Sequence, residues 1–413
     1  MQSKPSIPVD CCASPGLMSV DEAIKSMLGA ASTIVETETI KIEDSLNRIL
    51  AEDIIATLNV PGYDNSAMDG YAVRCEDISA GVSLNISQRI PAGTTGKPLE
   101  PGTAARIFTG APVPPGADAV VMQEKCHADN GRVSINTEVK VASNIRRAGE
   151  DIADGSTVLK TGQRIRPQEM GLLASVGRAE FKVKRQLKVA VFFTGDEIVS
   201  PGQPLQAGQI YNSNQYTITG FLQALNVEII NLGMVADTLE DTVRVLQQAA
   251  SAADLVITSG GVSVGEEDYV RLALEQLGKL SMWRIAMKPG KPVAFGKVGQ
   301  ALFLGLPGNP VSVFVTGLLF ARPLILTMQG ASQTAAPKLM ATANFDWPGG
   351  GRQEYLRVRI DNTGNAPVAC LYPHQGSGVL SSASWSDGLV EAAVNQPIKS
   401  GDKVSYIPFQ GLF

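Results

Sequence analysis

Histidine is nearly absent from this chain: only His127 and His374 occur among its 413 residues. A zinc site made of several histidines is therefore excluded, and none of the five cysteines lies in a CxxC pair that would replace them. Five scattered cysteines, an odd number, favour reduced thiols in a cytoplasmic protein over a disulfide framework. No run of about 18 consecutive apolar residues is present, so we expect no membrane span.

Other common signals are also missing. The chain has neither a Walker A loop nor a GxGxxG fingerprint, which excludes an ordinary P-loop NTPase and a Rossmann dinucleotide site. Its net charge of −5 argues against a broad nucleic-acid surface, because such a surface needs a basic face. Residues 1–16 lack the basic and apolar regions of a signal peptide, and we expect them to form a disordered tail.

What the chain has is ordinary globular composition, with 44% hydrophobic and 18% charged residues, in a length that predicts several domains. Between 186 and 332 short apolar runs alternate with amphipathic segments, which predicts a largely parallel sheet covered by helices. The expected strands are Val189–Phe193, Val227–Leu232, Leu255–Thr258 and Leu302–Gly305. The expected helices are Tyr216–Leu225, Leu239–Ala252, Tyr269–Leu277 and Val311–Met328, with a hairpin over Lys279–Lys297 at the sheet edge.

The remaining segments predict the other domains. Residues 61–144 are short strands punctuated by proline and glycine, typical of a β-rich insert. The flanking segments 17–60 and 145–185 should pack together as one discontinuous mixed helical domain, whose first helix starts at the capping box Ser19–Glu22. Residues 333–413 predict a small β-barrel. We therefore expect a multidomain α/β plus β protein with a central three-layer α/β domain, a β-rich insert and a C-terminal barrel.

Three polar loops follow successive strands of the α/β domain, and ligands collect at the carboxyl ends of such strands. Glu197 follows the first strand, Asp237 the second, and the paired glycines Gly260 and Gly261 the third. Paired glycines let backbone N–H groups approach an anion, and acids just beyond them are suited to Mg²⁺. A glycine-rich turn before a solvated acidic helix start explains the third loop equally well when that loop is taken alone.

Basic side chains gather in the Lys288-Pro289-Gly290-Lys291 turn. A rigid Pro-Gly turn between two ammonium groups favours an anion clamp over a solvated basic turn. Pro310 is suited to the first turn of a helix, whose N-terminus offers a further anion site.

Loops around the β insert have simpler alternatives. Asp69 is a candidate metal or hydroxyl ligand and Thr109 a candidate ligand contact, but an Asx-turn and a plain turn are favoured by the residues alone. Arg146 and Arg147 precede Asp151, so a phosphate-binding pair and a weak surface ion-pair cluster are equally consistent with that loop.

Six motifs together resemble the MoeA family of molybdopterin molybdenumtransferases, in order and spacing, over nearly the whole chain. They are Asn65-Ser66-Ala67-Met68-Asp69-Gly70, Asn144-Ile145-Arg146-Arg147, Thr194-Gly195-Asp196-Glu197, Ser259-Gly260-Gly261-Val262-Ser263-Val264-Gly265, Lys288-Pro289-Gly290-Lys291-Pro292 and Gly305-Leu306-Pro307-Gly308-Asn309-Pro310. The resemblance implies an elongated homodimer of four-domain chains whose α/β domain binds molybdopterin. The implied reaction converts adenylylated molybdopterin and molybdate, with Mg²⁺, into molybdenum cofactor and AMP.

The resemblance also assigns site residues. The catalytic ones are Asp69, Asp151, Glu197, Asp237, Asp268 and Lys288, with Asp237 and Asp268 as the Mg²⁺ ligands. The substrate-binding ones are Thr109, Arg146, Ser259, Gly260, Gly261, Ser263, Arg284, Lys291, Pro307, Gly308, Asn309, Pro310 and Ser377. Two positions depart from the family pattern. Arg284 follows Trp283 where bacterial members resemble Trp-Lys, and a guanidinium fork is not equivalent to an ammonium; Gly378 replaces bulkier residues.

Two other functions share part of this pattern. A molybdopterin adenylyltransferase has the same α/β domain, but the extra β domains and the Met68-Asp69-Gly70 loop argue against it. A non-catalytic molybdopterin-binding scaffold is disfavoured because Asp69, Asp237 and Asp268 are all retained. Nothing separates molybdate from tungstate. The partners implied by the resemblance are a molybdopterin adenylyltransferase and chaperones of apo-molybdoenzymes, with no nucleic acid and no membrane.

Overall fold

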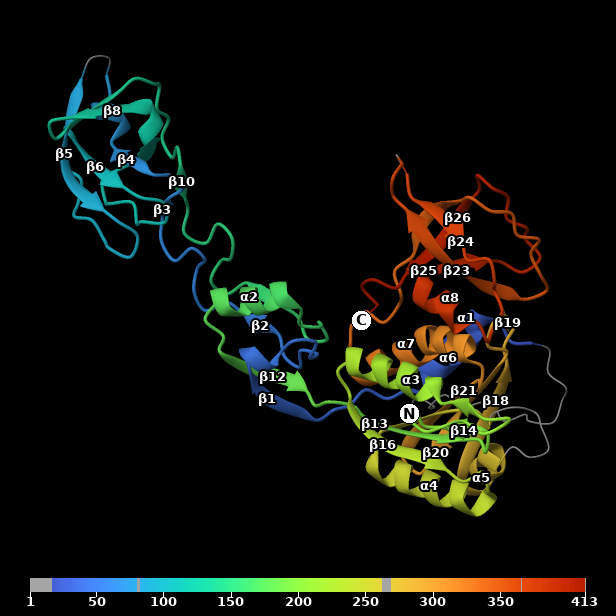
Figure 1. Cartoon of the computed structure of the whole chain (residues 1–413). Coiled ribbons are helices and arrows are strands. Elements are labelled where there is room, and N and C mark those ends of the chain that lie inside the picture. The colour runs from blue at the N-terminus through green and yellow to red at the C-terminus, as the bar shows by residue number, and fades with distance from the viewer. Residues whose placement is uncertain (1–16, 80–81, 262–268, 365, 413) are drawn as a thin grey trace, which may run out of the picture.

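The computed structural model describes residues 17–412 except 80–81, 262–268 and 365. Figure 1 shows four bodies: the β insert, a small mixed unit, the α/β unit and the C-terminal barrel. The mixed unit lies between the β insert and the α/β unit, so the insert stands apart from the rest of the chain (Figure 1). The barrel packs directly on the α/β unit.

The α/β unit is built on a six-stranded sheet. Its strand order is β16 (Glu228–Val235), β13 (Lys188–Thr194), β17 (Leu255–Ser259), β21 (Ala301–Leu306), β20 (Pro292–Val298) and β18 (Gly278–Arg284). The first four strands are parallel, and β20 and β18 form the antiparallel hairpin expected at the edge. Alternate residues of β13 face the two hydrophobic cores on opposite sides of the sheet. Val191 and Phe193 belong to one core, and Ala190 and Phe192 belong to the other. The predicted three-layer arrangement is confirmed.

Helices cover both faces of this sheet. They are α3 (Ser213–Ala224), α4 (Leu239–Ala252), α5 (Tyr269–Leu277), α6 (Pro310–Thr316) and α7 (Arg322–Met328), with a π-helical turn, Gly317–Ala321, joining the last two. Short strands β14 (Ile198–Val199) and β15 (Ile210–Tyr211) precede α3. The helices α4 and α5 have the predicted limits, since their apolar spacing and the Thr238 cap define them well.

The segment Pro310–Met328 bears on the expectation that the chain has no membrane span. By length and composition alone this 19-residue helix would be long and apolar enough to cross a membrane, although we expected no such span. Its polar residues, such as Arg322, interrupt the consecutive apolar run that the expectation was based on. Within the fold 89% of its most apolar stretch is buried. It is therefore the core helix of the α/β unit.

The first helix, α1 (Val20–Ala30), starts at the predicted capping box: the Ser19 hydroxyl accepts from the Glu22 backbone N–H, and the Glu22 carboxylate accepts from Ser19. We expected this helix to pack within the mixed domain. Instead Val20 and Met27 belong to the core of the α/β unit, where α1 contacts α7. The reason is apolar complementarity with a segment far along the chain, which local sequence patterns do not register.

The mixed unit holds little helix. Its elements are β1 (Thr37–Lys41), a 3₁₀ turn (Ile42–Asp44), β2 (Ile54–Ile55), β11 (Thr157–Leu159), α2 (Pro167–Ser175) and β12 (Glu180–Lys184). Strand β1 pairs with β12 and β2 with β11, so the segments on either side of the insert pack together. Leu50, Leu173 and Phe181 form its core.

Two β units complete the chain. The insert has a sheet in the order β7 (Ala119–Met122), β4 (Gly70–Val73), β6 (Thr103–Ile107), β5 (Ser83–Ile90), β9 (Arg132–Ile135) and β8 (Cys126–Asp129). It also contains two 3₁₀ turns, Cys75–Asp77 and Gln123–Lys125. A separate two-stranded pair joins β3 (Asn65–Ser66) to β10 (Ile145–Arg146). In the barrel, β23 (Gln353–Asp361), β24 (Val368–Leu371), β22 (Leu339–Ala343), β26 (Lys403–Pro408) and β25 (Gly388–Ala392) pair in that order, and β25 pairs back to β23. This closure confirms the predicted barrel, which also contains α8 (Leu380–Trp385) and receives β19 (Met287–Lys288).

Gly70 has a structural role within its motif. A Cβ at this position would lie 1.9 Å from the carbonyl oxygen of Val121 on the paired strand β7. Gly70→Ala should therefore destabilise the insert by about 2–3 kcal/mol, because backbone must move to admit the methyl group. Chemical denaturation measures this. Gly62→Ala is the matched control, since its nearest atom would be 3.8 Å away; equal stability of the two variants would contradict the prediction.

Candidate active site

The carboxyl ends of β13, β17 and β21 meet at one edge of the central sheet. The Gly260 backbone N–H donates to the Leu306 carbonyl at 3.2 Å. Gly260 and Gly261 both have positive φ, of 88° and 62°, and a Cβ on Gly261 would lie 2.7 Å from Val270. A Cβ on Gly308 would lie 3.8 Å from the Gly260 Cα. Glycine is therefore required in the Gly260-Gly261 loop, where alanine would be strained, whereas at Gly308 a Cβ would make only an ordinary contact. The paired glycines leave an edge of exposed backbone beside buried Ser259.

Two of the predicted acids lie on this same edge. Glu197 follows β13, and its carbonyl accepts from the Ile210 backbone N–H at 2.8 Å, which holds the loop against β15. Asp237 follows the neighbouring strand β16, just before the Thr238 cap of α4. The third acid, Asp268, and Ser263 lie outside the described residues. The described acids therefore occupy adjacent strand ends, as parallel strand topology requires.

The lysine turn reaches this edge through the antiparallel hairpin. Because β20 runs opposite to β21, with Ala294 opposite Gly305, the start of β20 lies beside the end of β21. The Ile285 backbone N–H donates to the Lys291 carbonyl at 2.9 Å and closes the turn. Gly290 packs so tightly that a Cβ would lie 2.5 Å from Thr316. The side chains of Lys288 and Lys291 are exposed beyond this buried Pro-Gly centre.

Pro307, Gly308, Asn309 and Pro310 form the loop between β21 and α6, and a barrel loop meets them there. The Val311 backbone N–H donates to the Ser377 carbonyl at 2.9 Å, which places Ser377 at the start of α6. Arg284, the position that departs from the family pattern, ends β18 beside the lysine turn, opposite Pro292.

Sequence reasoning missed two residues here. Asn214 donates from its Nδ2 to the Gly308 carbonyl at 2.6 Å, and Glu354 of the barrel lies 3.3 Å from the Lys288 ammonium. Asn214 stands in an Asn-Ser-Asn run that indicates only a helix start, and its amide contact arises 94 residues away. Glu354 lies in an alternating strand that carries no site signal.

A second group of predicted residues lies in the β insert. Asp69 Oδ1 accepts from the Thr109 backbone N–H at 2.8 Å and from the Thr109 hydroxyl at 2.7 Å. These bonds, with the nearby positive charge of Arg106, hold the pKa of Asp69 below its usual range. The Arg106 guanidinium donates to the Gly70 carbonyl and stacks on Phe108. The contact of Asp69 is thus with a distant strand end, and the Asx-turn favoured by the residues alone is wrong.

The two arginines Arg146 and Arg147 differ in their contacts, and so in whether they fit a phosphate-binding pair or a surface ion pair. Arg147 pairs with Asp64, so the surface ion-pair interpretation holds for that residue. Arg146 lies on β10 opposite Asn65, is exposed, and has no ion pair among the described residues. Asp151 is exposed where the insert joins the mixed unit, and its backbone N–H donates to the Val60 carbonyl at 3.0 Å.

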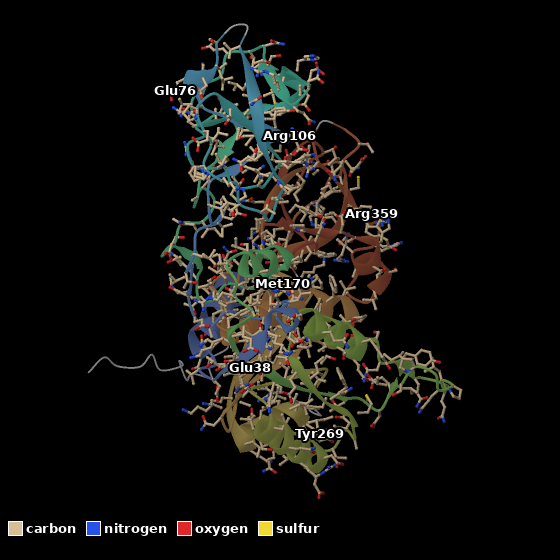
Figure 2. The ribbon with its side chains drawn as sticks, turned by 90° about the vertical axis from the view of Figure 1, so that its left-hand side faces the viewer. Glu38, Glu76, Arg106, Met170, Tyr269 and Arg359 are labelled. Carbon is tan, nitrogen blue, oxygen red and sulfur yellow. The ribbon has the colours of Figure 1, made fainter. Side chains whose placement is uncertain are left out.

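The two groups are far apart within one chain. Figure 2 shows Arg106, beside Asp69, at the opposite end of the molecule from Tyr269, which starts the helix after the glycine loop. Figure 1 likewise places β4 and β10 away from β13 and β21. Asp69, Thr109, Arg146 and Asp151 therefore do not join the α/β edge within this chain.

Metal chemistry at the edge depends on few protein ligands. Among the described residues no group of three or more His, Cys, Asp or Glu side chains is placed to hold a metal ion. Mg²⁺, however, is commonly bound by one or two carboxylates together with substrate phosphates and water. Asp237, at an edge suited to phosphates, fits that donor set.

Comparison with known proteins identifies the family. Three family models match: the MoeA N-terminal region, domains I and II, over residues 18–177; a probable molybdopterin binding domain over 190–327; and the MoeA C-terminal region, domain IV, over 341–409. A molybdopterin molybdenumtransferase of Haemophilus influenzae is 41% identical, covering 96% of this chain and 100% of the relative. One of Nostoc is 40% identical, covering 78% and 76%.

Solved structures agree. The crystal structure of a molybdopterin biosynthesis moeA protein from Pyrococcus horikoshii superimposes with a TM-score of 0.83 at 28% identity, over 95% of this chain and 100% of that one. Three matched regions in the expected order, together with near-complete coverage by relatives, leave no large part of the chain outside the comparison. The chain belongs to the MoeA family and has a role in molybdenum cofactor biosynthesis.

Proposed function

We propose that this protein inserts molybdenum from molybdate into adenylylated molybdopterin and releases molybdenum cofactor and AMP. The observation that carries the proposal is the convergence of the glycine loop, the lysine turn and the Ser377 loop at one sheet edge. Backbone N–H groups and ammonium groups there suit a substrate with several phosphates and a tetrahedral oxyanion. The names of the relatives support this chemistry.

The edge divides naturally into two roles. The backbone of Ser259, Gly260 and Gly261 and the Pro307–Pro310 loop would hold the phosphate-bearing pterin, since glycine allows close approach. Lys288 and Lys291, with Arg284 beside them, would hold molybdate by charge. Positioning and electrostatic stabilisation then lower the barrier, and no covalent protein nucleophile is needed.

Asp237, with Asp268 from the sequence-based assignment, would hold Mg²⁺. When bound, the ion supplies Lewis-acid polarisation of the phosphoanhydride. Glu197, on the adjacent strand end, would contact the nucleotide ribose or base, or order a water at the ion. The chain itself keeps the substrate phosphates against a rigid sheet edge.

The separated group implies an assembly. If Asp69, Thr109, Arg146 and Asp151 act in the reaction, a second copy of the chain must bring its β insert to the α/β edge. A homodimer with two equivalent composite sites satisfies this requirement, and closed twofold symmetry is the commonest arrangement for identical chains. Asp69, fixed by Thr109 and anionic at neutral pH, would then face the substrate from the partner copy.

The proposed partners follow from the proposed substrates, and the scattered cysteines favour the cytoplasm as the location. A molybdopterin adenylyltransferase would supply the adenylylated substrate, and chaperones of apo-molybdoenzymes would receive the product, in the cytoplasm. The adenylyltransferase function itself and the non-catalytic scaffold remain the competing proposals.

Anaerobic incubation of the pure protein with adenylylated molybdopterin, Mg²⁺ and molybdate tests the proposal, with AMP followed by chromatography. We expect AMP release that requires molybdate. AMP attachment from ATP would instead identify an adenylyltransferase. Tight pterin binding without AMP release would identify a scaffold and overturn the proposed reaction.

A further inference from the structure

The lysine turn is held by the barrel as well as by its own domain. Strand β19, which ends at Lys288, pairs in parallel with β23, and Lys288 lies opposite Glu354 in the register. The Gln353 backbone N–H donates to the Ala286 carbonyl at 2.8 Å, and the Arg352 guanidinium donates to the Met287 carbonyl at 3.2 Å. The backbone that carries Lys288 is therefore fixed across a domain boundary.

The Glu354 side chain is the charged element of this junction. Glu354 is only 6% exposed, and its Oε2 lies 3.3 Å from the Lys288 Nζ. A Cβ on Gly350 would lie 2.7 Å from Glu354 Oε1, so the backbone at Gly350 packs closely against the other carboxylate oxygen. Within the described residues Lys288 is its sole ion-pair partner. A shielded carboxylate is costly unless opposite charge lies nearby, and here the Lys288 ammonium and the buried Arg357 guanidinium both supply it.

An aromatic ring also lies near the same ammonium. The Lys288 Nζ lies 5.8 Å from the Trp347 ring centroid, within cation–π range. The Lys288 side chain is nevertheless 45% exposed. One ammonium group thus touches a carboxylate and an aromatic face while remaining open to an incoming anion.

We propose that Glu354 is a positioning residue: it holds the Lys288 ammonium at one place beside the sheet edge and partly neutralises it until the oxyanion binds. The assignment of molybdate to Lys288 rests on the proposed function. Without the carboxylate, the ammonium would be a stronger but less well placed anion site. Affinity for the anion and the rate of turnover should therefore change in opposite directions.

The test compares Glu354→Gln with a matched control, Glu391→Gln. Glu391 lies on the neighbouring barrel strand β25, and its shielded carboxylate pairs with exposed Lys338 at 2.8 Å and not with Lys288. Calorimetric titration with molybdate should show Glu354→Gln binding about two- to fivefold more tightly, the range expected for removing a partly exposed ion pair. Its kcat should fall about tenfold because the ammonium is no longer held in place. The control should match wild type in both.

A second variant pair shows whether Glu354 acts through Lys288. In a Lys288→Gln background, Glu354→Gln should leave molybdate affinity unchanged, because the two effects couple completely. An undiminished effect there, or a Glu354→Gln variant indistinguishable from Glu391→Gln, overturns the proposal. Glu354→Asp replaces Glu354→Gln if the latter does not fold, with a lower kcat expected from the shortened side chain. Absent turnover in wild type would refute the proposed function, while the binding measurements would still decide the role of Glu354.

Discussion

Co-expression of an Asp69→Asn chain with a Lys288→Ala chain should restore turnover that neither variant has alone. Each variant by itself should lose about 100-fold or more, because each removes a fixed charge from both composite sites of the proposed dimer. In the mixed dimer one site combines both defects, and the other combines intact Asp69 with intact Lys288. Purified mixed dimers, selected with two different tags, should therefore show about half of wild-type activity.

The matched control is a second mixed dimer, in which one chain carries both substitutions and the other carries none. A wild-type chain paired with an Asp69→Asn/Lys288→Ala chain has one defect in each composite site, so this mixed dimer should be nearly inactive. If each site were contained in one chain, the two pairings would exchange their results. The asparagine keeps Oδ1 as the acceptor for both Thr109 donors, so the loop should fold as before and only the charge is lost.

Replacing Asp237 with asparagine should abolish most molybdate-dependent AMP release, by about two to three orders of magnitude, while pterin binding partly persists. The physical reason is that the proposed Mg²⁺ ligand loses its charge, whereas the glycine loop proposed to hold the phosphates is untouched. Asp268→Asn should behave in the same way. AMP release and equilibrium pterin binding are measured on the same preparations.

Substituting a neighbouring acid tests whether the loss of AMP release comes from the lost Mg²⁺ ligand or only from a change in the local electrostatic potential. Glu240 lies in the first turn of α4, three residues beyond Asp237, and is exposed. Glu240→Gln should keep wild-type turnover. Chelation of Mg²⁺ should reduce wild-type activity to the level of Asp237→Asn and should not reduce that variant much further. Unchanged turnover in both Asp237→Asn and Asp268→Asn would remove these residues from the mechanism.

Periodicity in the sequence determines much of the central domain. Helices Leu239–Ala252 and Tyr269–Leu277 have the expected limits, because amphipathic spacing and a Thr cap are local signals. The strand ends near Glu197, Asp237 and Gly260 then meet at one edge, since parallel strands end on the same side of a sheet. One local signal was nevertheless missed: α3 begins at Ser213, not at the predicted Tyr216, because the Asn212 side chain caps it.

Local patterns failed where a distant partner decides the outcome. Nothing near Ser19–Ala30 shows that α1 packs against α7, and nothing near Asp69 shows that the insert stands away from the α/β unit. Glu354 was missed for the same reason: its partner Lys288 lies 66 residues away on another domain. Such contacts depend on how domains are placed, and that placement is set by surfaces spread over the whole chain.

The packing of α1 against α7 constrains the order in which the chain folds during translation. Hydrogen bonds join this N-terminal segment to the end of α7 over 294 residues, as between Thr33 and Thr327. During synthesis Val20, Ala23 and Met27 leave the ribosome about 300 residues before their partners on α7. The β insert, whose strands are contiguous in sequence, can fold meanwhile as a unit. The nascent chain therefore exposes the apolar residues of this segment through most of translation, and α1 is among the last elements to pack, because a helix this short is marginal in water without its partners.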